Sequence, residues 1–359
     1  MVAALRLVAL LIATLASLSA AAGTIYPPVR APAELVFPRD FGAHPQYRSE
    51  WWYLTGWLND AANMPAGFQL SFFRVRPGLQ EDNPSSFAPR QLILAHAAVS
   101  DPSLGRLRSA ERSARQGFGL AGAESGDTRV AIDDWSLRRE GMTYVARVRS
   151  AAFAYELTAT AEAAPLLQGE AGFSRKDADP RHASYYYSRP QLAVRGWIEL
   201  DGRRRVVSGR AWLDHEWSSE MLPERAVGWD WLGVNLNDGG ALMAFRIRDA
   251  TGATLWAGGS LQQPGRAPRA LGPADFALTP LRRWRSPRSG AAYPVEMAVQ
   301  AGDLKLHLVP LLDDQELDAR RTTGAVYWDG AVRALDADQR QLGQGYLELT
   351  GYAGRFRLK

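Results

Sequence analysis

Cysteine is absent from the 359-residue sequence. This absence excludes a disulfide framework, a thiolate nucleophile, a cysteine-ligated zinc or iron–sulfur site and lipid attachment at a cysteine. A strong charge of one sign is also missing, because 42 Lys and Arg residues face 38 Asp and Glu residues and leave a net charge of +4. So small a net charge does not indicate the basic surface that binds nucleic acids, and we expect no nucleic-acid partner.

Long apolar runs are scarce, and the one that stands out covers residues 7–18, directly after Arg6. Small residues follow at 19–22, so a charged start, an apolar stretch and a cleavage site lie in the order of a secretory signal peptide. The run is shorter than the roughly 18 residues that a transmembrane helix needs. We therefore expect a signal peptide at residues 1–22 and a periplasmic or secreted mature protein, with an uncleaved anchor as the alternative.

Segments with helical periodicity are few and short, and the best of them lies around residues 313–318. After a proline-rich lead, most of the chain consists of short runs in which apolar and polar residues alternate, bounded by Gly, Asp, Asn or Pro. Examples are residues 69–75, 144–148, 192–200 and 304–308. A period of two predicts β-strands, and their spacing favours an all-β protein of sandwiches or barrels.

One hairpin occurs twice in the sequence. WWYLTGWLND at residues 51–60 aligns with WDWLGVNLND at residues 229–238, and residues 209–215 align with residues 343–349. Two copies half a chain apart predict two similarly built β domains with a boundary near residue 218. Small closed barrels suit such strands, because closure removes unpaired edges and the mouth can hold one apolar ligand. His215 has no counterpart in the second copy, and we interpret unmatched polar residues as the better candidates for chemistry.

Three consecutive ionisable residues stand between tryptophans at the end of the first copy. They are Asp214, His215 and Glu216, and Trp217 follows them. On a strand, Asp214 and Glu216 share one face, and His215 takes the other with Leu213 and Trp217. Inside an apolar lumen, the pKa of His215 falls through desolvation unless a carboxylate offsets it, which leaves a base or donor near neutral pH. The alternative is a structural role, in which the cluster forms a salt-bridged turn at the domain junction.

Two aromatic segments are further candidates for the wall of a cavity. The tyrosines at 185–187 offer phenol donors, and the acidic residue at 50 precedes an aromatic strand at 51–53. Both segments are equally consistent with packing in a barrel. No G-x-S-x-G elbow occurs, which disfavours an α/β-hydrolase. His215 and Glu216 begin an H-E-x-x-H motif, but Ser219 replaces its second histidine, so this zinc motif is incomplete and we expect no metal.

Taken together, these segments resemble the exported AttH-like family, which is related to carotenoid 1,2-hydratase (hydroxyneurosporene synthase). The resemblance covers the chain from about residue 37 to its end. It implies two consecutive lipocalin-like, calycin-type β-barrel domains, a hydratase-type one at 37–218 and a second one at 219–359. The stretches that carry it are residues 37–40, 44–45, 50–53, 95–96, 183–188, 214–217, 228–231 and 346–352.

The resemblance also implies an activity, since hydratases of this family add water to an isolated terminal alkene of an acyclic carotenoid. They use a His-x-Trp pair, matched here by His215 and Trp217, and a Tyr-x-Asp pair, where this chain has Phe-Arg-Ile at 245–247. The acid that protonates the alkene is then Asp214, Asp230 or Glu216, and no metal or redox cofactor is needed. The catalytic candidates are Asp214, His215, Glu216 and Trp217, and the ligand-binding candidates are Trp52, Tyr53, Tyr185, Tyr186, Tyr187, Trp229, Asp230 and Trp231.

Three functions are consistent with these residues. The first is an exported protein that binds a hydrophobic isoprenoid or lipid-like molecule between or within its barrels and acts on it as a hydro-lyase. The second is a non-catalytic periplasmic lipid carrier or accessory protein of an envelope transporter, which the missing Tyr-x-Asp pair favours. The third is hydrolysis of an ester or amide, which rests on the label of secreted hydrolases that the family also carries.

Overall fold

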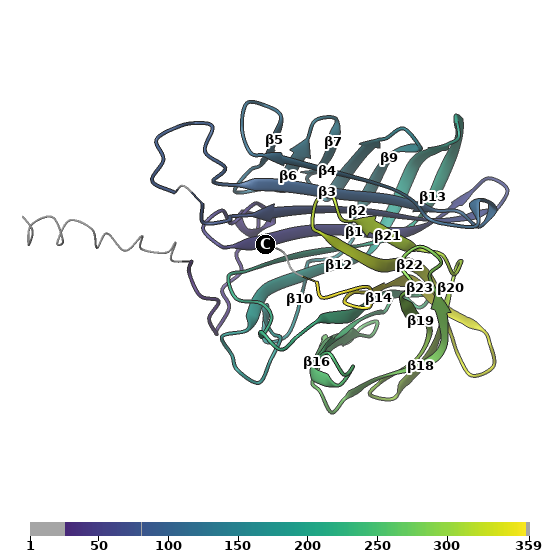
Figure 1. The fold of residues 1–359 in the computed structure, drawn as a ribbon. Helices are drawn as coiled ribbons and strands as arrows, with labels where there is room; N and C mark the ends of the chain where they lie inside the picture. Colours follow the sequence, from purple (N-terminus) through teal and green to yellow (C-terminus); the bar gives the residue numbers. More distant parts are fainter. Residues whose placement is uncertain (1–25, 80, 357–359) are drawn as a thin grey trace, which may run out of the picture.

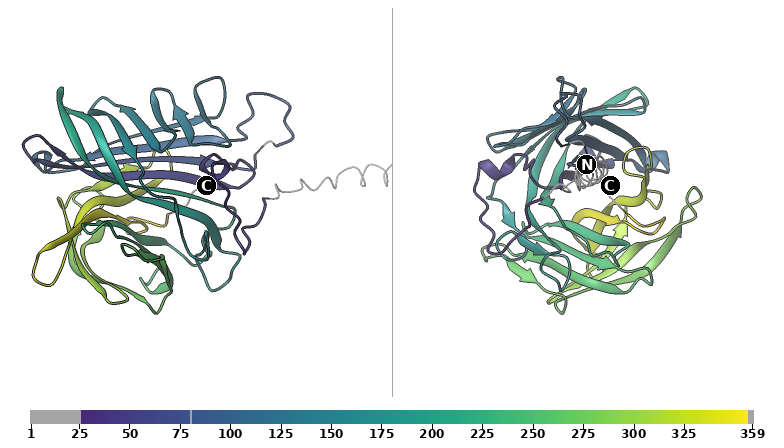
Figure 2. Two further views of the ribbon diagram at one scale, coloured as in Figure 1. Left: turned by 180° about the vertical axis from the view of Figure 1, so that it is seen from behind. Right: turned by 60° about the vertical axis from the view of Figure 1, so that its left-hand side comes forward.

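The computed structural model describes residues 26–79 and 81–356, so the predicted signal peptide lies outside the described residues. The chain forms two antiparallel β-sheets, each curved into a nearly closed, lipocalin-like barrel. In Figure 1 the first sheet, coloured purple to teal, lies above the second, coloured green to yellow, and Figure 2 shows the pair from two other sides. Helical structure in the described residues is limited to two 3-10 turns, η1 (Arg39–Phe41) and η2 (Pro102–Leu104), and none of these residues form a helix that could cross a membrane.

The first sheet has thirteen strands within the described residues, in the order β4-β3-β2-β1-β13-β12-β9-β8-β7-β6-β5, and β10 and β11 pair with β12. The two ends of this strand order come close together in space. Arg112 on the edge strand β4 donates a hydrogen bond of 3.3 Å to the carbonyl of Ile132 on β6, which lies next to the other edge strand, β5. The strands are β1 (Ser49–Asp60), β2 (Pro65–Val75), β3 (Leu92–Ser100), β4 (Arg108–Arg115), β5 (Ala121–Ala123), β6 (Arg129–Ile132), β7 (Trp135–Glu140), β8 (Thr143–Arg149), β9 (Phe153–Thr160), β10 (Leu166–Leu167), β11 (Phe173–Arg175), β12 (Ala183–Leu200) and β13 (Arg203–Ser218).

The second sheet has ten strands in the described part of the chain, in the order β17-β16-β15-β14-β23-β22-β20-β19-β18, and β21 pairs with β22. The repeated hairpin forms β1 and β2 in the first barrel and β14 and β15 in the second. The strands are β14 (Gly228–Leu236), β15 (Ala241–Arg248), β16 (Thr254–Gln262), β17 (Arg269–Leu271), β18 (Phe276–Arg285), β19 (Ala292–Ala301), β20 (Leu304–Pro310), β21 (Glu316–Ala319), β22 (Ala325–Leu335) and β23 (Gln341–Leu349).

The prediction of a helix around residues 313–318 is wrong. The segment contains the start of β21, which pairs with β22. Leu317 and Ala319 alternate toward the first barrel, where they pack with Ala98 and Leu107. A six-residue segment has little helical stability of its own, so this tertiary contact decides its conformation.

Strand alternation gives the repeated hairpin two buried faces. On β1, Leu54 and Leu58 point into the core of the first barrel, whereas Tyr53 and Trp57 point toward the second barrel. On β14, Leu232 lies in the core of the second barrel, as its position in the repeat requires. The two barrels therefore pack through corresponding strands, and each of these strands is buried on both sides.

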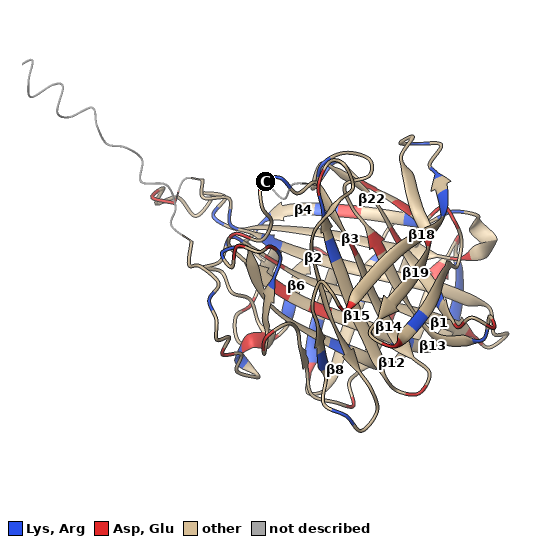
Figure 3. Cartoon of the chain, turned by 90° about the horizontal axis from the view of Figure 1, so that it is seen from below, with Lys and Arg blue, Asp and Glu red and all other residues tan. Residues whose placement is uncertain are grey.

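Direct hydrogen bonds join the barrels across this interface. The Trp57 indole donates to the carbonyl of Gly345 at 2.9 Å, and the Tyr53 hydroxyl donates to Asp329 at 2.6 Å. Gly67 on β2 packs directly against side chains of the second barrel, and a Cβ added there would lie 2.5 Å from the Tyr346 hydroxyl. Figure 3 marks Lys and Arg in blue and Asp and Glu in red along the ribbon, and both colours occur on the strands and on the loops.

Candidate functional site

A cavity of about 690 Å³ lies between the two barrels. This volume is in the range of pockets that hold small organic ligands. Residues 219–224, which connect β13 to β14, line it together with Arg355 and Phe356 near the end of the described chain. Aromatic side chains from both barrels contribute to its walls: Trp51, Tyr53, Phe73, Tyr186, Trp229, Trp231, Phe245 and Tyr327.

Asp214 is the first of several carboxyl groups on the cavity wall. It accepts hydrogen bonds from the Tyr186 hydroxyl at 2.6 Å, the Ser188 hydroxyl at 2.5 Å and the Trp212 indole at 2.7 Å. Burial outweighs these three donors and raises the pKa of Asp214 to about 7, and the nearby charge of Glu216 acts in the same direction. Asp214 therefore retains its proton in a large fraction of molecules at neutral pH.

Glu348 on β23 is a second carboxyl of this kind. It lines the cavity and accepts one hydrogen bond, from the Trp229 indole at 3.0 Å. Burial is the main cause that raises its pKa to about 7; the charges of Asp214 and Glu216 act in the same direction and the indole donor acts against them. Its cross-strand neighbour Asp329 also has a pKa well above the usual value, because it is fully buried and close to Glu348.

Glu216 differs from these two groups because a cation accompanies it. Lys176 Nζ lies 2.8 Å from a carboxylate oxygen of Glu216, and both side chains are buried. The same ammonium group lies 4.2 Å from the ring centre of Phe245 and 5.0 Å from that of Tyr186. The Ser184 hydroxyl also donates to Glu216. The cavity thus holds an ion-paired carboxylate beside carboxyl groups that have no such partner.

Six of the twelve candidates from the sequence lie on this cavity: Tyr53, Tyr186, Asp214, Glu216, Trp229 and Trp231. The sequence candidates did not include Glu348, although a signal for it exists. In the alignment of residues 209–215 with 343–349, Glu348 falls opposite Asp214. The position shared by Asp214 and Glu348 places one acid from each copy on the cavity. The interpretation that unmatched polar residues are the better candidates favours His215 instead.

His215 lies on the opposite face of β13, as strand alternation predicts, and points into the end of the first barrel. Its Nε2 lies 2.8 Å from Glu50, its Nδ1 lies 3.0 Å from the Tyr187 hydroxyl, and its ring stacks on Trp52 at 4.7 Å between centres. Burial lowers the pKa of His215 to about 4, although Glu50 acts in the other direction. His215, Tyr187 and Trp52 pack against one another on this face of the sheet, and none of the three lines the cavity between the barrels.

The remaining three candidates lie elsewhere. Tyr185 and Trp217 line a second pocket of about 560 Å³ at the end of the first barrel, together with His44. Asp230 is fully buried and pairs with Arg246 at 2.6 Å and with Arg248 at 2.9 Å. Two guanidinium groups hold this carboxylate in place, so Asp230 stabilises the second barrel and is removed from the candidates for the acid.

Sequence comparison with protein-family models gives one match, the AttH-like model, over residues 28–352. The chain belongs to the AttH-like family. This membership agrees with the order of motifs in the sequence and with the two-barrel architecture. No curated protein matches the sequence.

The AttH-like protein is also similar to solved structures. One is a crystal structure of a protein assigned as AttH from Nitrosomonas europaea, at 46% identity and a TM-score of 0.84, covering 91% of this chain and 99% of that one. Kievitone hydratase from Nectria haematococca has a TM-score of 0.68 at 12% identity, covering 92% and 96%. CghA has a TM-score of 0.51 at 13% identity, covering 93% and 96%. The last two likenesses show a shared fold.

Proposed function

We propose that this AttH-like protein is a hydro-lyase that adds water to a carbon–carbon double bond of a hydrophobic, isoprenoid-like molecule in the cavity between its barrels. One observation carries the proposal: Asp214 and Glu348, each with a pKa of about 7, lie on the wall of an aromatic cavity. Protonation of an unactivated alkene requires a carboxylic acid that its apolar surroundings keep neutral. Both groups meet this requirement near neutral pH.

The other residues of the cavity fit the remaining steps of hydration. Asp214 or Glu348 gives its proton to one alkene carbon, which forms a C–H bond and leaves a cation on the other carbon. The rings of Trp229 and Trp231 stabilise this cation, because an aromatic face attracts positive charge. Water then forms the C–O bond and gives its extra proton to the Glu216 carboxylate. Glu216 releases this proton to solvent and the acid takes one up from solvent, so both groups return to their starting states and the net reaction adds one water to the double bond.

The same geometry accounts for the departure from the family's Tyr-x-Asp pair. Phe245 and Ile247 occupy those positions and contribute apolar surface to the cavity. The acid is then supplied from β13 and β23 instead of β15. The fold shared with kievitone hydratase is consistent with hydration, although at 12% identity it supports the architecture only.

Turnover measurements on two variants test this function. We would incubate the protein with acyclic isoprenoids in H₂¹⁸O and measure the labelled alcohol by mass spectrometry. Removal of the acid, by Asp214→Asn or by Glu348→Gln, should lower turnover by about 10²- to 10⁴-fold, the usual contribution of a general acid, and the variant with this loss identifies the proton donor. Glu199→Gln, at a half-buried ion pair remote from the cavity, is the matched control and should retain activity. Full turnover in both cavity variants would refute the assignment.

The second function that we propose to test is a non-catalytic lipid carrier, including an accessory role with an envelope transporter. The size and aromatic lining of the cavity suit lipid binding without any reaction. Native mass spectrometry of the purified protein separates the two functions. An intact lipid that stays unaltered after long incubation supports the carrier, whereas a product heavier by one water supports the hydro-lyase.

We also propose that the protein is exported, because the pattern at residues 1–22 is that of a signal peptide. Cell fractionation and the mass of the mature chain test this. Recovery from the periplasm or medium with an N-terminus near residue 21–23 supports export with cleavage. A full-length chain in the cytosol contradicts it.

A further inference from the structure

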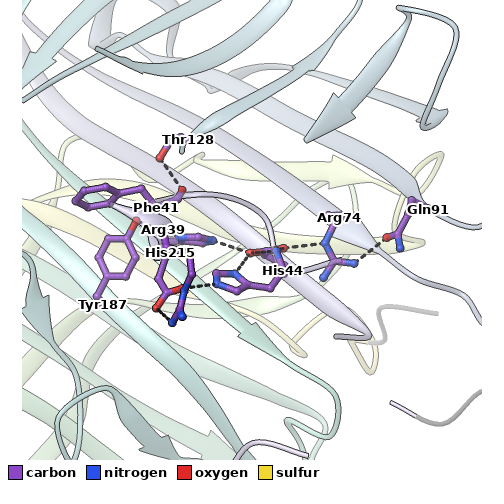
Figure 4. Close-up of polar contacts among 10 residues, drawn as sticks. Arg39, Phe41, His44, Arg74, Gln91, Thr128, Tyr187 and His215 are labelled. Carbon is purple, nitrogen blue, oxygen red and sulfur yellow. Dashed lines mark hydrogen bonds and ion pairs between the residues drawn. The ribbon is translucent and has the colours of Figure 1, made fainter. Parts of the chain in front are cut away.

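Two histidines and one glutamate meet at the end of the first barrel, on the other side of β13 from the cavity. His44 Nδ1 lies 2.7 Å and His215 Nε2 lies 2.8 Å from the same oxygen, Oε1 of Glu50. The potential ligand atoms of the three residues all lie within 4.8 Å of one another. Figure 4 shows His44 and His215 converging from the segment before β1 and from β13.

The outer atoms of these three groups are each held by a further partner. His44 Nε2 lies 3.3 Å from Asp40, His215 Nδ1 lies 3.0 Å from the Tyr187 hydroxyl, and Arg74 donates to Glu50 Oε2 at 2.7 Å. Metal-binding histidines commonly have such a carboxylate or hydroxyl partner on their second nitrogen, which orients the ring. The outer contacts aim one atom of each group at a common point.

The second pocket provides a path to this point. His44, Asp40 and Trp217 line that pocket, and the side chain of His44 is 12% exposed whereas those of Glu50 and His215 are fully buried. Trp217 stacks on the His44 ring at 3.7 Å between centres and fixes its orientation. A small ion entering from solvent would meet His44 first.

We propose that His44 Nδ1, Glu50 Oε1 and His215 Nε2 bind a divalent transition-metal ion of the zinc type. The fourth coordination position would face the second pocket and take water. Two imidazoles and one carboxylate are a ligand set that zinc accepts at about 2.0–2.2 Å, with ligand atoms about 3.4 Å apart. Binding therefore replaces two hydrogen bonds and requires each nitrogen to move about 0.6 Å away from Glu50.

The sequence conceals this set because its ligands are not close along the chain. The H-E-x-x-H pattern that begins at His215 lacks its second histidine. In the proposed set the second histidine is His44, and β1 supplies the carboxylate. Cross-strand pairing places Trp52 opposite His215, so Glu50 lies two residues further along the same face. His44 comes from the segment just before that strand.

Metal titration of the full-length mature chain, purified without a histidine tag and treated with chelator, tests the site. We expect calorimetry to find one Zn²⁺ per chain, and Co²⁺ to give the strong visible absorption of four-coordinate cobalt. His44→Gln should weaken Zn²⁺ binding by at least about 100-fold. Asp40→Asn should weaken it by about 10- to 100-fold, because the group that hydrogen-bonds a metal-binding histidine and orients its ring commonly contributes that much. His307→Gln, at a histidine near Glu296 in the second barrel, is the matched control and should bind normally.

Two results would overturn the proposal: the absence of stoichiometric Zn²⁺ binding to the wild-type protein, or equal binding by wild type and His44→Gln. Near-ultraviolet circular dichroism establishes that each variant is folded, which is expected for His44→Gln because Arg74 and His215 still partner Glu50. If that variant does not fold, the Asp40→Asn titration and the cobalt spectrum of the wild type decide. The outcome is independent of the hydro-lyase activity, since Asp214 and Glu348 lie on the other side of β13.

Discussion

The raised pKa of Asp214 makes a quantitative prediction about folding stability. The carboxyl has a pKa of about 7 in the folded protein and of 3.8 in the unfolded reference. Below pH 3.8 the group is protonated in both states and its titration has no effect on stability. As the pH rises toward 7, the unfolded chain ionises first, so the folded state loses stability throughout this window. Because each pKa unit corresponds to about 1.4 kcal/mol, the total loss approaches about 4 kcal/mol.

Asp214→Asn removes this titration and leaves the shape of the side chain nearly unchanged. The amide cannot accept from all three donors, namely Tyr186, Ser188 and Trp212, so the variant also has a constant penalty of about 1–3 kcal/mol. That penalty does not vary with pH. The wild-type free energy of unfolding minus that of the variant should therefore fall by up to about 4 kcal/mol between pH 4 and pH 7.5.

Urea unfolding followed by tryptophan fluorescence at several pH values measures this difference. Asp338→Asn is a suitable control, because it removes one negative charge at a residue whose side chain is 71% exposed. Subtraction of the variant from the wild type cancels the titration of the other groups, apart from Glu216 and Glu348, which interact directly with Asp214. A difference that stays constant across pH 4–7.5 would refute the account of Asp214 as a buried, readily protonated acid.

Two further predictions concern the second barrel and the interface. Asp230→Ala should lower the free energy of unfolding by about 3–5 kcal/mol, because it leaves Arg246 and Arg248 without their buried partner; Asp338→Ala at the exposed pair with Arg340 should cost less than about 1 kcal/mol. Gly67→Ala should cost about 1–3 kcal/mol, since its methyl group would collide with Tyr346. Gly122→Ala, where the nearest atom is 3.9 Å away, should be nearly neutral. Urea unfolding measures all four, and a reversed order within either pair contradicts the reasoning.

Strand alternation predicts the relative orientation of the site residues from sequence alone. It separates Asp214 and Glu216 from His215, and the structure has this arrangement. Alternation could not show which face meets the second barrel. The usual signal for an outer face is a polar residue at every second position, and this signal is missing from the end of β13 because both of its faces are buried.

The location of the cavity was less accessible to prediction than the fold. The repeat indicates two barrels, and a lone barrel suggests a ligand inside its mouth. The interiors of both barrels are filled by packed apolar side chains. The cavity lined by Asp214 and Glu348 lies between the barrels, and the second pocket lies at the end of the first barrel. The packing of the two barrels depends on contacts between residues far apart in the sequence, and the periodicity within each copy does not predict these contacts.

The duplicated frame explains why Asp214 and Glu348 both lie on the cavity, whereas Glu216 has no acidic counterpart in the second copy. Asp214 and Glu348 occupy equivalent positions on β13 and β23. Because the two barrels pack against each other through these copies, both carboxyl groups lie on the same cavity. Two residues later the copies differ. The first copy has Glu216 and the second has Thr350, whose hydroxyl accepts a hydrogen bond from the backbone N–H of Trp229. The carboxylate that pairs with Lys176 therefore comes from the first copy. Shared positions supply the acid and an unmatched position supplies the base, so both kinds of residue are needed to build an asymmetric reaction site from a repeated fold.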